Sequence, residues 1–198
     1  MKHVTSSHTD LLIKKYFGSK RGGLNFTRHQ LLWYCGYYNK LSKINFNDAK
    51  RLIFVCEGNI CRSPVAELIA QNHGSNTCSF GLSCSDNHPA DPRAIAFAET
   101  LGLDLSKHRT RNISHYQPAI GDLLIGMEPR HIVILDMLLG KAINRTLLGI
   151  FHQPPFTYIH DPYSTTPAFF TRCEQQVVSA TRNLLLKMLS ANETQHRT

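Results

Sequence analysis

The fold depends on one stretch, Arg51-Leu52-Ile53-Phe54-Val55-Cys56-Glu57-Gly58-Asn59-Ile60-Cys61-Arg62-Ser63-Pro64. Its first five residues form a mostly apolar run that predicts a buried strand. The residues from about 61 to 73 predict a helix that ends at Gly74. The polar loop between these elements therefore connects the carboxyl end of a strand to the beginning of a helix.

Strands and helices continue to alternate after this stretch. Further strands are predicted at 77–82, 122–127 and 146–151, and further helices at 92–101, 129–139 and about 167–190. The pattern predicts an α/β fold with a doubly wound, four-stranded parallel sheet and helices on both faces. Ligands bind such sheets at the carboxyl ends of the strands, where the Cys56 loop is expected to lie.

The first 50 residues differ in composition from the other 148. They hold nine of the 22 Lys and Arg residues but only two of the 14 acidic residues, and eight of the 18 aromatic residues. The charge step predicts a boundary near Lys50, with a basic, aromatic-rich helical extension over 1–50 and the α/β domain over 51–198. Gly18, Gly22 and Gly23 are expected to divide the extension, and residues 10–17 and about 27–44 are expected to be helical.

Composition also restricts the class of protein. The apolar runs are shorter than the roughly 18 residues that a membrane span needs, and residues 1–7 lack the features of a signal peptide. Six scattered cysteines without Cys-x-x-Cys spacing indicate neither a disulfide scaffold nor a metal site. We therefore expect a cytoplasmic protein with no metal and no cofactor.

The spacing Cys-x5-Arg in the loop favours phosphate chemistry. Backbone N–H groups of such a loop can surround an anion, and the following helix adds its positive end. Gly58 permits a tight turn, and the planar fork of Arg62 can bind two phosphate oxygens. The same positive field favours the thiolate form of Cys56, which makes it the predicted nucleophile. Ser63 is expected to donate a hydrogen bond to that thiolate.

A phosphate ester also needs an acid to protonate its leaving group. Asp161 in His160-Asp161-Pro162-Tyr163 lies in a predicted loop between the fourth strand and the last helix. A tyrosine leaving group has a pKa of about 10, so its oxygen must be protonated as it departs. Asp161 is therefore the predicted general acid, and later the general base that activates water.

These residues resemble the low-molecular-weight protein tyrosine phosphatases. The resemblance lies in the segment Val55–Pro64 and in Asp161-Pro162-Tyr163, and extends over about residues 51–190. It implies a protein tyrosine phosphatase that works through a phosphocysteine intermediate on a phosphotyrosine protein, such as a bacterial tyrosine kinase of polysaccharide export. The implied substrate-binding residues are Glu57, Gly58, Asn59, Ile60, Cys61, Ser63 and Tyr163.

The resemblance also implies supporting roles. Asn59 is expected to brace the loop, and His108 to hydrogen-bond to Asn59. Cys61 matches a cysteine that can form a reversible disulfide with the nucleophile in this family; whether it does so here stays open, as do the physiological substrate and the oligomeric state.

Two other functions compete with this prediction. A thioredoxin-coupled arsenate reductase shares the fold and loop, but it needs relay cysteines downstream, and residues 100–150 contain none. A non-catalytic phosphotyrosine-binding module would be expected to lack Cys56, Arg62 or Asp161, and all three are present.

The extension also leaves two alternatives. Its basic, aromatic-rich helices could contact an anionic membrane surface or a membrane kinase, or they could pack against the catalytic domain and expose their lysines. Nucleic acid is not an expected partner, because the residues match no reader motif.

Overall fold

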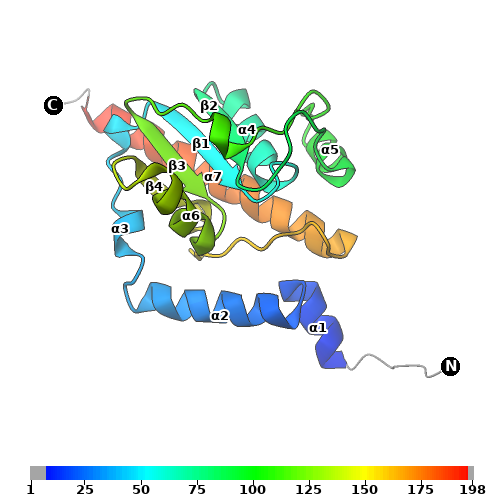
Figure 1. The fold of residues 1–198 in the computed structure, drawn as a ribbon. Coiled ribbons are helices and arrows are strands. Elements are labelled where there is room, and N and C mark those ends of the chain that lie inside the picture. Colours follow the sequence, from blue (N-terminus) through cyan, green and yellow to red (C-terminus); the bar gives the residue numbers. More distant parts are fainter. Residues whose placement is uncertain (1–7, 196–198) are drawn as a thin grey trace.

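A four-stranded parallel sheet lies at the centre of the computed structural model, which describes residues 8–195 (Figure 1). The strands are β1 (Arg51–Cys56), β2 (Thr77–Gly81), β3 (Asp122–Gly126) and β4 (Asn144–Leu147). Their order is β2-β1-β3-β4, and every neighbouring pair is parallel. The chain turns to opposite sides of β1 to form β2 and β3, so the carboxyl end of β1 opens into a crevice.

Helices cover both faces of the sheet. Leu52 and Phe54 of β1 lie in a buried cluster with residues of α4 (Arg62–Asn72), α5 (Pro92–Glu99) and α7 (Pro167–Gln195). Ile53 and Val55, which point to the other face, pack with Leu135 of α6 (Pro129–Leu139). Successive strand residues point to opposite faces, and helices cover both faces. Both sets of side chains are therefore apolar and fully buried. The predicted doubly wound α/β fold is confirmed.

The fourth strand differs from its prediction. It begins two residues earlier and ends at Leu147, and residues 148–151 form a 3-10 helix (Leu148–Phe151). This short helix is buried along its length, and the oxygen of Gly149 accepts hydrogen bonds from the N–H groups of His152 and Phe156. A short apolar run is compatible with either structure, so the sequence pattern did not distinguish them.

The extension forms α1 (His8–Phe17), α2 (Lys20–Tyr34) and α3 (Asn39–Ser42). The prediction of one long helix over 27–44 was wrong at both ends. Ser19 caps α2 by accepting a hydrogen bond from the N–H of Gly22, so two glycines expected to divide the helices lie inside one. Gly36, with φ of +78°, separates α2 from α3.

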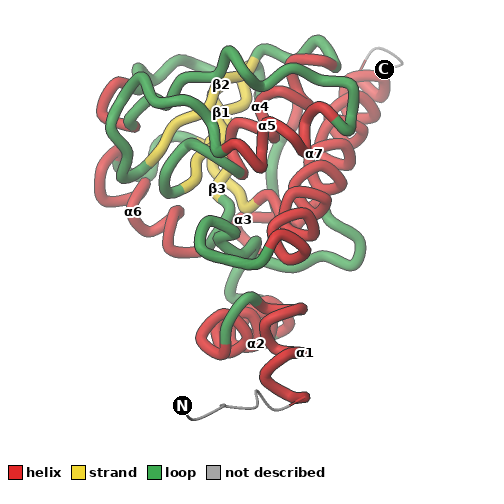
Figure 2. The backbone as a smooth tube through the Cα atoms, turned by 90° about the vertical axis from the view of Figure 1, so that its right-hand side faces the viewer, coloured by secondary structure: helices red, strands yellow, loops and turns green. Residues whose placement is uncertain are grey.

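Figures 1 and 2 show α1 and α2 on one side of the body, and aromatic contacts join these helices to it. The ring of Phe26 in α2 stacks on His160 with centroids 5.8 Å apart, and Phe17 of α1 lies 6.1 Å from the same ring. Tyr38 is buried with Ile132 and Leu147 of the body. The helices thus pack against the body and adjoin the segment that carries Asp161. None of the helices within residues 8–195 is long and apolar enough to cross a membrane.

Candidate active site

Cys56 ends β1 at the crevice between β2 and β3. It lies in register with Gly81, the last residue of β2, and its side chain is 2% exposed. A Cβ atom at Gly81 would come within 3.1 Å of the backbone nitrogen of Asn59, so glycine lets the loop lie against β2. The loop leads directly into α4, whose N-terminus has no capping side chain. The first N–H groups of α4 are therefore available to an anion.

Two hydrogen-bond partners surround the Cys56 sulfur. The backbone N–H of Asn59 donates to Sγ over 3.3 Å, and the Ser63 hydroxyl lies 3.0 Å from it. Donors directed at sulfur stabilise its anionic form. The expected contact between Ser63 and Cys56 is therefore present in the structure.

Asn59 connects the loop to three other segments. Its φ of +52° lies in the left-handed region, which asparagine tolerates better than most residues. Its Nδ2 donates to the hydroxyls of Ser63 and Ser79, and its Oδ1 accepts from the N–H of Arg111. Nε2 of His108 lies 2.8 Å from the carbonyl oxygen of Asn59, which is the contact that the resemblance implied.

These bonds determine where the Ser63 proton points. Ser79 donates its own proton to Glu67 over 2.5 Å, so its oxygen is free to accept from Asn59. The Ser63 oxygen likewise accepts from Asn59, which leaves its single proton for the sulfur of Cys56. The network thus makes Ser63 a donor to Cys56.

Arg62 lies buried beneath the loop, with 1% of its surface exposed. One terminal nitrogen donates to Glu128 over 2.6 Å and to the carbonyl of Ile159, and the other pairs with Asp161 over 3.2 Å. Burial opposes the charge, yet the carboxylates of Asp161 and Glu128 raise the pKa of Arg62 above its ordinary value. Burial likewise opposes the Glu128 charge, but Arg62 brings the pKa of Glu128 down to about 2. Both side chains are therefore ionised at neutral pH.

Asp161 reaches the loop from the far side of the crevice. The N–H of Ile159 donates to the carbonyl of Met127 beyond β3, which fixes the segment leading to Asp161. After it, Arg93 donates to the carbonyls of Tyr163 and Thr165. The Asp161 side chain remains 41% exposed and faces Arg62. The acid candidate is thus anchored on both sides and accessible to solvent.

Cys56, Arg62 and Asp161 line one cavity of about 230 Å³. Its other lining residues are Glu57, Gly58, Ile60, Cys61, Ser83 and Tyr163. The predicted nucleophile, phosphate clamp and acid therefore meet at one site. Asn59, Ser63 and His108 support the loop from behind, and the Glu57 side chain pairs with Arg130 at the rim.

Three contributors were missed by sequence reasoning. Glu128 holds Arg62, Arg93 holds the Asp161 segment, and Ser83 lines the cavity. Glu128 lies just after β3, and Arg93 lies at the start of α5. Both fall within the residues over which the sequence resembles the family. Their contacts lie 66 to 72 residues away along the chain, so local spacing gave no signal for them.

Two further ionisable groups are buried at the site, Cys61 in the loop itself and Glu174 of α7. Burial raises the pKa of the Cys61 thiol well above its ordinary range. Glu174 of α7 is fully buried, and neither of its carboxyl oxygens has a hydrogen-bond partner among residues 8–195. Burial raises the pKa of Glu174 to about 8 despite the charge of Arg62. Both groups therefore carry a proton at neutral pH.

The fold and the cavity define an α/β protein with a buried thiol and an arginine at the carboxyl end of β1. The model of the family described as low molecular weight phosphotyrosine protein phosphatase matches residues 51–195. The low molecular weight protein-tyrosine-phosphatase Wzb of Salmonella typhi is 36% identical over 115 residues, which are 57% of this chain and 76% of that protein.

Solved structures agree with this match. Wzb of Escherichia coli K30 with sulphate has a TM-score of 0.61 and 30% identity, over 70% of this chain and 98% of that one. Wzb of Vibrio vulnificus with benzylphosphonate has a TM-score of 0.61 and 26% identity, over 70% and 99%. The chain belongs to the low-molecular-weight phosphotyrosine protein phosphatase family and is an enzyme of that class.

Proposed function

We propose that this enzyme hydrolyses protein tyrosine phosphate through a covalent phosphocysteine on Cys56. The observation that supports this most directly is that Cys56, Arg62 and Asp161 line one cavity of about 230 Å³. A purely binding module would have no need for the thiol and the acid at the same site. The benzylphosphonate bound by the Vibrio vulnificus relative is an aromatic phosphonate, which supports a phenolic ester as substrate.

In the first step the Cys56 thiolate attacks phosphorus, and the bond to the tyrosine oxygen breaks. Asp161 gives its proton to that oxygen, and Arg62 together with the loop N–H groups holds the three phosphoryl oxygens. In the second step Asp161 takes a proton from water, which attacks the phosphocysteine. Inorganic phosphate leaves, and the returning thiolate is stabilised by the proton of Ser63.

The test separates the nucleophile from the acid. Cys56→Ser should remove turnover of p-nitrophenyl phosphate while circular dichroism stays unchanged. Asp161→Asn should lower kcat/KM, which reports the departure of the leaving group, roughly 10²- to 10³-fold for phenyl phosphate, whose leaving group needs a proton. The loss should be smaller for p-nitrophenyl phosphate, whose leaving group is more acidic. Equal losses for both substrates would argue against Asp161 as the acid, and a fully active Cys56→Ser enzyme against the whole scheme.

The finer parts of the sequence prediction stay proposals. The substrate is proposed to be a phosphotyrosine protein such as a bacterial tyrosine kinase of polysaccharide export, and the relatives named Wzb support this class. The boundary near Lys50 is supported by the beginning of the family match at residue 51. A cytoplasmic location also remains a prediction, which the six unpaired cysteines support. Thioredoxin consumption on addition of arsenate would favour the reductase alternative.

Contact with an anionic membrane is proposed for the outer surface of α2. Leu24, Leu31 and Tyr34 are 60–76% exposed, and Tyr37 beyond the helix is 72% exposed. Apolar side chains beside a basic segment suit a membrane surface. The full chain should co-sediment with phosphatidylglycerol vesicles at low salt, and Leu24→Ser with Leu31→Ser should reduce this binding. Absence of binding at low salt would remove the proposal.

A further inference from the structure

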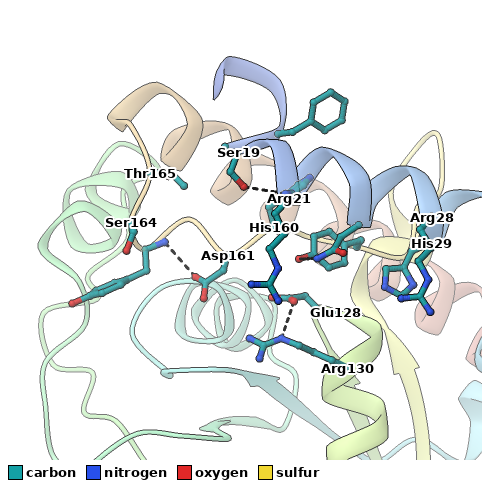
Figure 3. A pocket seen from close by; sticks show the side chains of 16 residues that line it. Ser19, Arg21, Arg28, His29, Glu128, Arg130, His160, Asp161, Ser164 and Thr165 are labelled. Atoms are coloured by element: carbon teal, nitrogen blue, oxygen red, sulfur yellow. Dashed lines mark hydrogen bonds and ion pairs between the residues drawn. The ribbon is translucent and has the colours of Figure 1, made fainter. Parts of the chain in front are cut away.

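A second, larger cavity adjoins the candidate active site. Its volume is about 630 Å³, and it lies between α1–α2 and the segment around Asp161 (Figure 3). Asp161 and Tyr163 line both this cavity and the smaller one above Cys56. A peptide whose phosphotyrosine enters the small cavity would therefore place its neighbouring residues in or beside the large one.

Two arginines of α2 project into this cavity. Arg21, Asn25 and Arg28 are spaced by four and three residues, so they share one side of the helix. All three line the cavity, and Figure 3 shows Arg21 and Arg28 pointing toward the side where Glu128 and Arg130 lie. Beside the packed ring of Phe26, α2 therefore presents two cations to this cavity.

The carboxylates of the cavity are already paired. Glu128 is bound by Arg62 over 2.6 Å and by Arg130 over 3.0 Å, and Asp161 is bound by Arg62 over 3.2 Å. No ion pair joins Arg21 or Arg28 to an acidic residue within the described part of the chain, 8–195. Their charges are thus available to an anionic ligand, and guanidinium groups bind carboxylate and phosphate oxygens with paired hydrogen bonds.

We propose that the cavity between α2 and the Asp161 segment is a second anion subsite, which binds an acidic residue or a second phosphate flanking the phosphotyrosine of the substrate. Arg21 and Arg28 are its specificity-determining residues. The subsite rests on the proposed function, because it assumes that phosphotyrosine occupies the cavity above Cys56. Both arginines precede residue 51, where the family match begins, so the subsite belongs to the extension of this chain.

Binding to a catalytically inactive protein gives the most direct test. Two peptides carry one phosphotyrosine each, flanked by glutamates in one and by glutamines in the other, and a third carries a second phosphotyrosine. In the full chain with Cys56→Ser, calorimetry should show tighter binding of the glutamate and doubly phosphorylated peptides. Adding Arg21→Gln and Arg28→Gln should weaken these two about five- to tenfold, as expected for exposed ion pairs, and should remove the preference over the glutamine peptide.

The matched control removes two lysines of the same extension. Lys40 and Lys43 are exposed and do not line the cavity, so Lys40→Gln with Lys43→Gln changes the net charge equally and should keep the preference. Equal binding of all peptides by the Cys56→Ser protein, or an equal loss in the lysine control, would overturn the subsite. Failure of the proposed function would look different, because the wild-type chain would then hydrolyse none of these peptides whatever their binding order.

Discussion

At the scale of single residues, the candidate site places most of its polar groups in defined bonds. Asn59 uses its carbonyl oxygen and both ends of its side chain, and Ser63 directs its only proton to Cys56. A loop held in this way does not need to reorganise when the dianion arrives, which is the condition for electrostatic stabilisation of a transition state. The nucleophile is therefore oriented by Asn59 and Ser63 before the substrate arrives.

Glu174 is an exception, because neither of its carboxyl oxygens has a hydrogen-bond partner among residues 8–195. Burial raises its pKa from 4.5 to about 8. Between these two values the folded protein keeps a proton that the unfolded chain has lost, so this carboxyl makes the unfolding free energy fall as pH rises.

Glu174→Gln should remove that pH dependence, since an amide resembles the protonated acid. Urea unfolding at pH 5 and pH 8 should show the variant gaining stability over the wild type as pH rises, by an amount on the order of a few kcal/mol. A difference between the two proteins that does not change with pH would contradict the assignment of a neutral Glu174.

At the scale of elements, the position of α2 depends on close contact at Gly22. A Cβ atom there would lie 2.3 Å from the carbonyl oxygen of Phe17 and 3.2 Å from Nδ1 of His160. At Gly23 the nearest neighbour of such an atom would be 3.4 Å away, an ordinary contact. Adjacent glycines in one helix thus have different tolerance for a side chain.

Gly22→Ala should destabilise the extension by about 1–3 kcal/mol, because the added methyl meets backbone. Gly23→Ala should instead stabilise it by about 0.5–1 kcal/mol through the better helix propensity of alanine. Trp33 of α2 is the only tryptophan, so its fluorescence in urea reports on this element. Equal effects of the two substitutions would show that α2 does not pack against α1 and His160 as described.

The elements also show how much of the structure could be predicted from the sequence. The Cys56 loop, the helix after it and the position of Asp161 before the last helix were predictable, because each signal is local. The pairing of Arg62 with Glu128 was not, since 66 residues separate them and only the sheet order β2-β1-β3-β4 brings them together. The prediction that Gly22 marks a helix boundary was wrong. A glycine is present there because a side chain would meet Phe17 and His160, and helix propensity carries no information about such tertiary contacts.

At the scale of the whole molecule, the extension forms one wall of the region beside the active site. His160 immediately precedes Asp161 and is enclosed by rings of Phe17, Phe26, Tyr158 and Phe169. Two of these rings come from the extension. Burial lowers the pKa of His160 to about 4, so the ring is neutral in this enclosure. The packing of α1 and α2 thus bears directly on the segment that carries the acid.

Removal of residues 1–44 should expose His160 and return its pKa toward 6.5. An NMR titration of the His160 ring in the full and shortened chains measures this directly, and resonances of the buried His131 serve as the internal reference. The shortened chain should also show a lower kcat/KM for phosphotyrosine peptides, because the Asp161 segment loses its support. An unchanged His160 titration would mean that the extension does not cover this ring in solution.

In the proposed mechanism the phosphoryl group is transferred to the sulfur of Cys56 before it reaches water. The most direct measurement is a rapid acid quench of the wild-type enzyme during turnover of p-nitrophenyl phosphate, followed by mass mapping of its peptides. We expect one phosphoryl group on the peptide that contains Cys56, and none on that peptide in Cys56→Ser. Sustained turnover with the phosphoryl group on another residue, or with no covalent phosphoenzyme at any quench time, would contradict this mechanism.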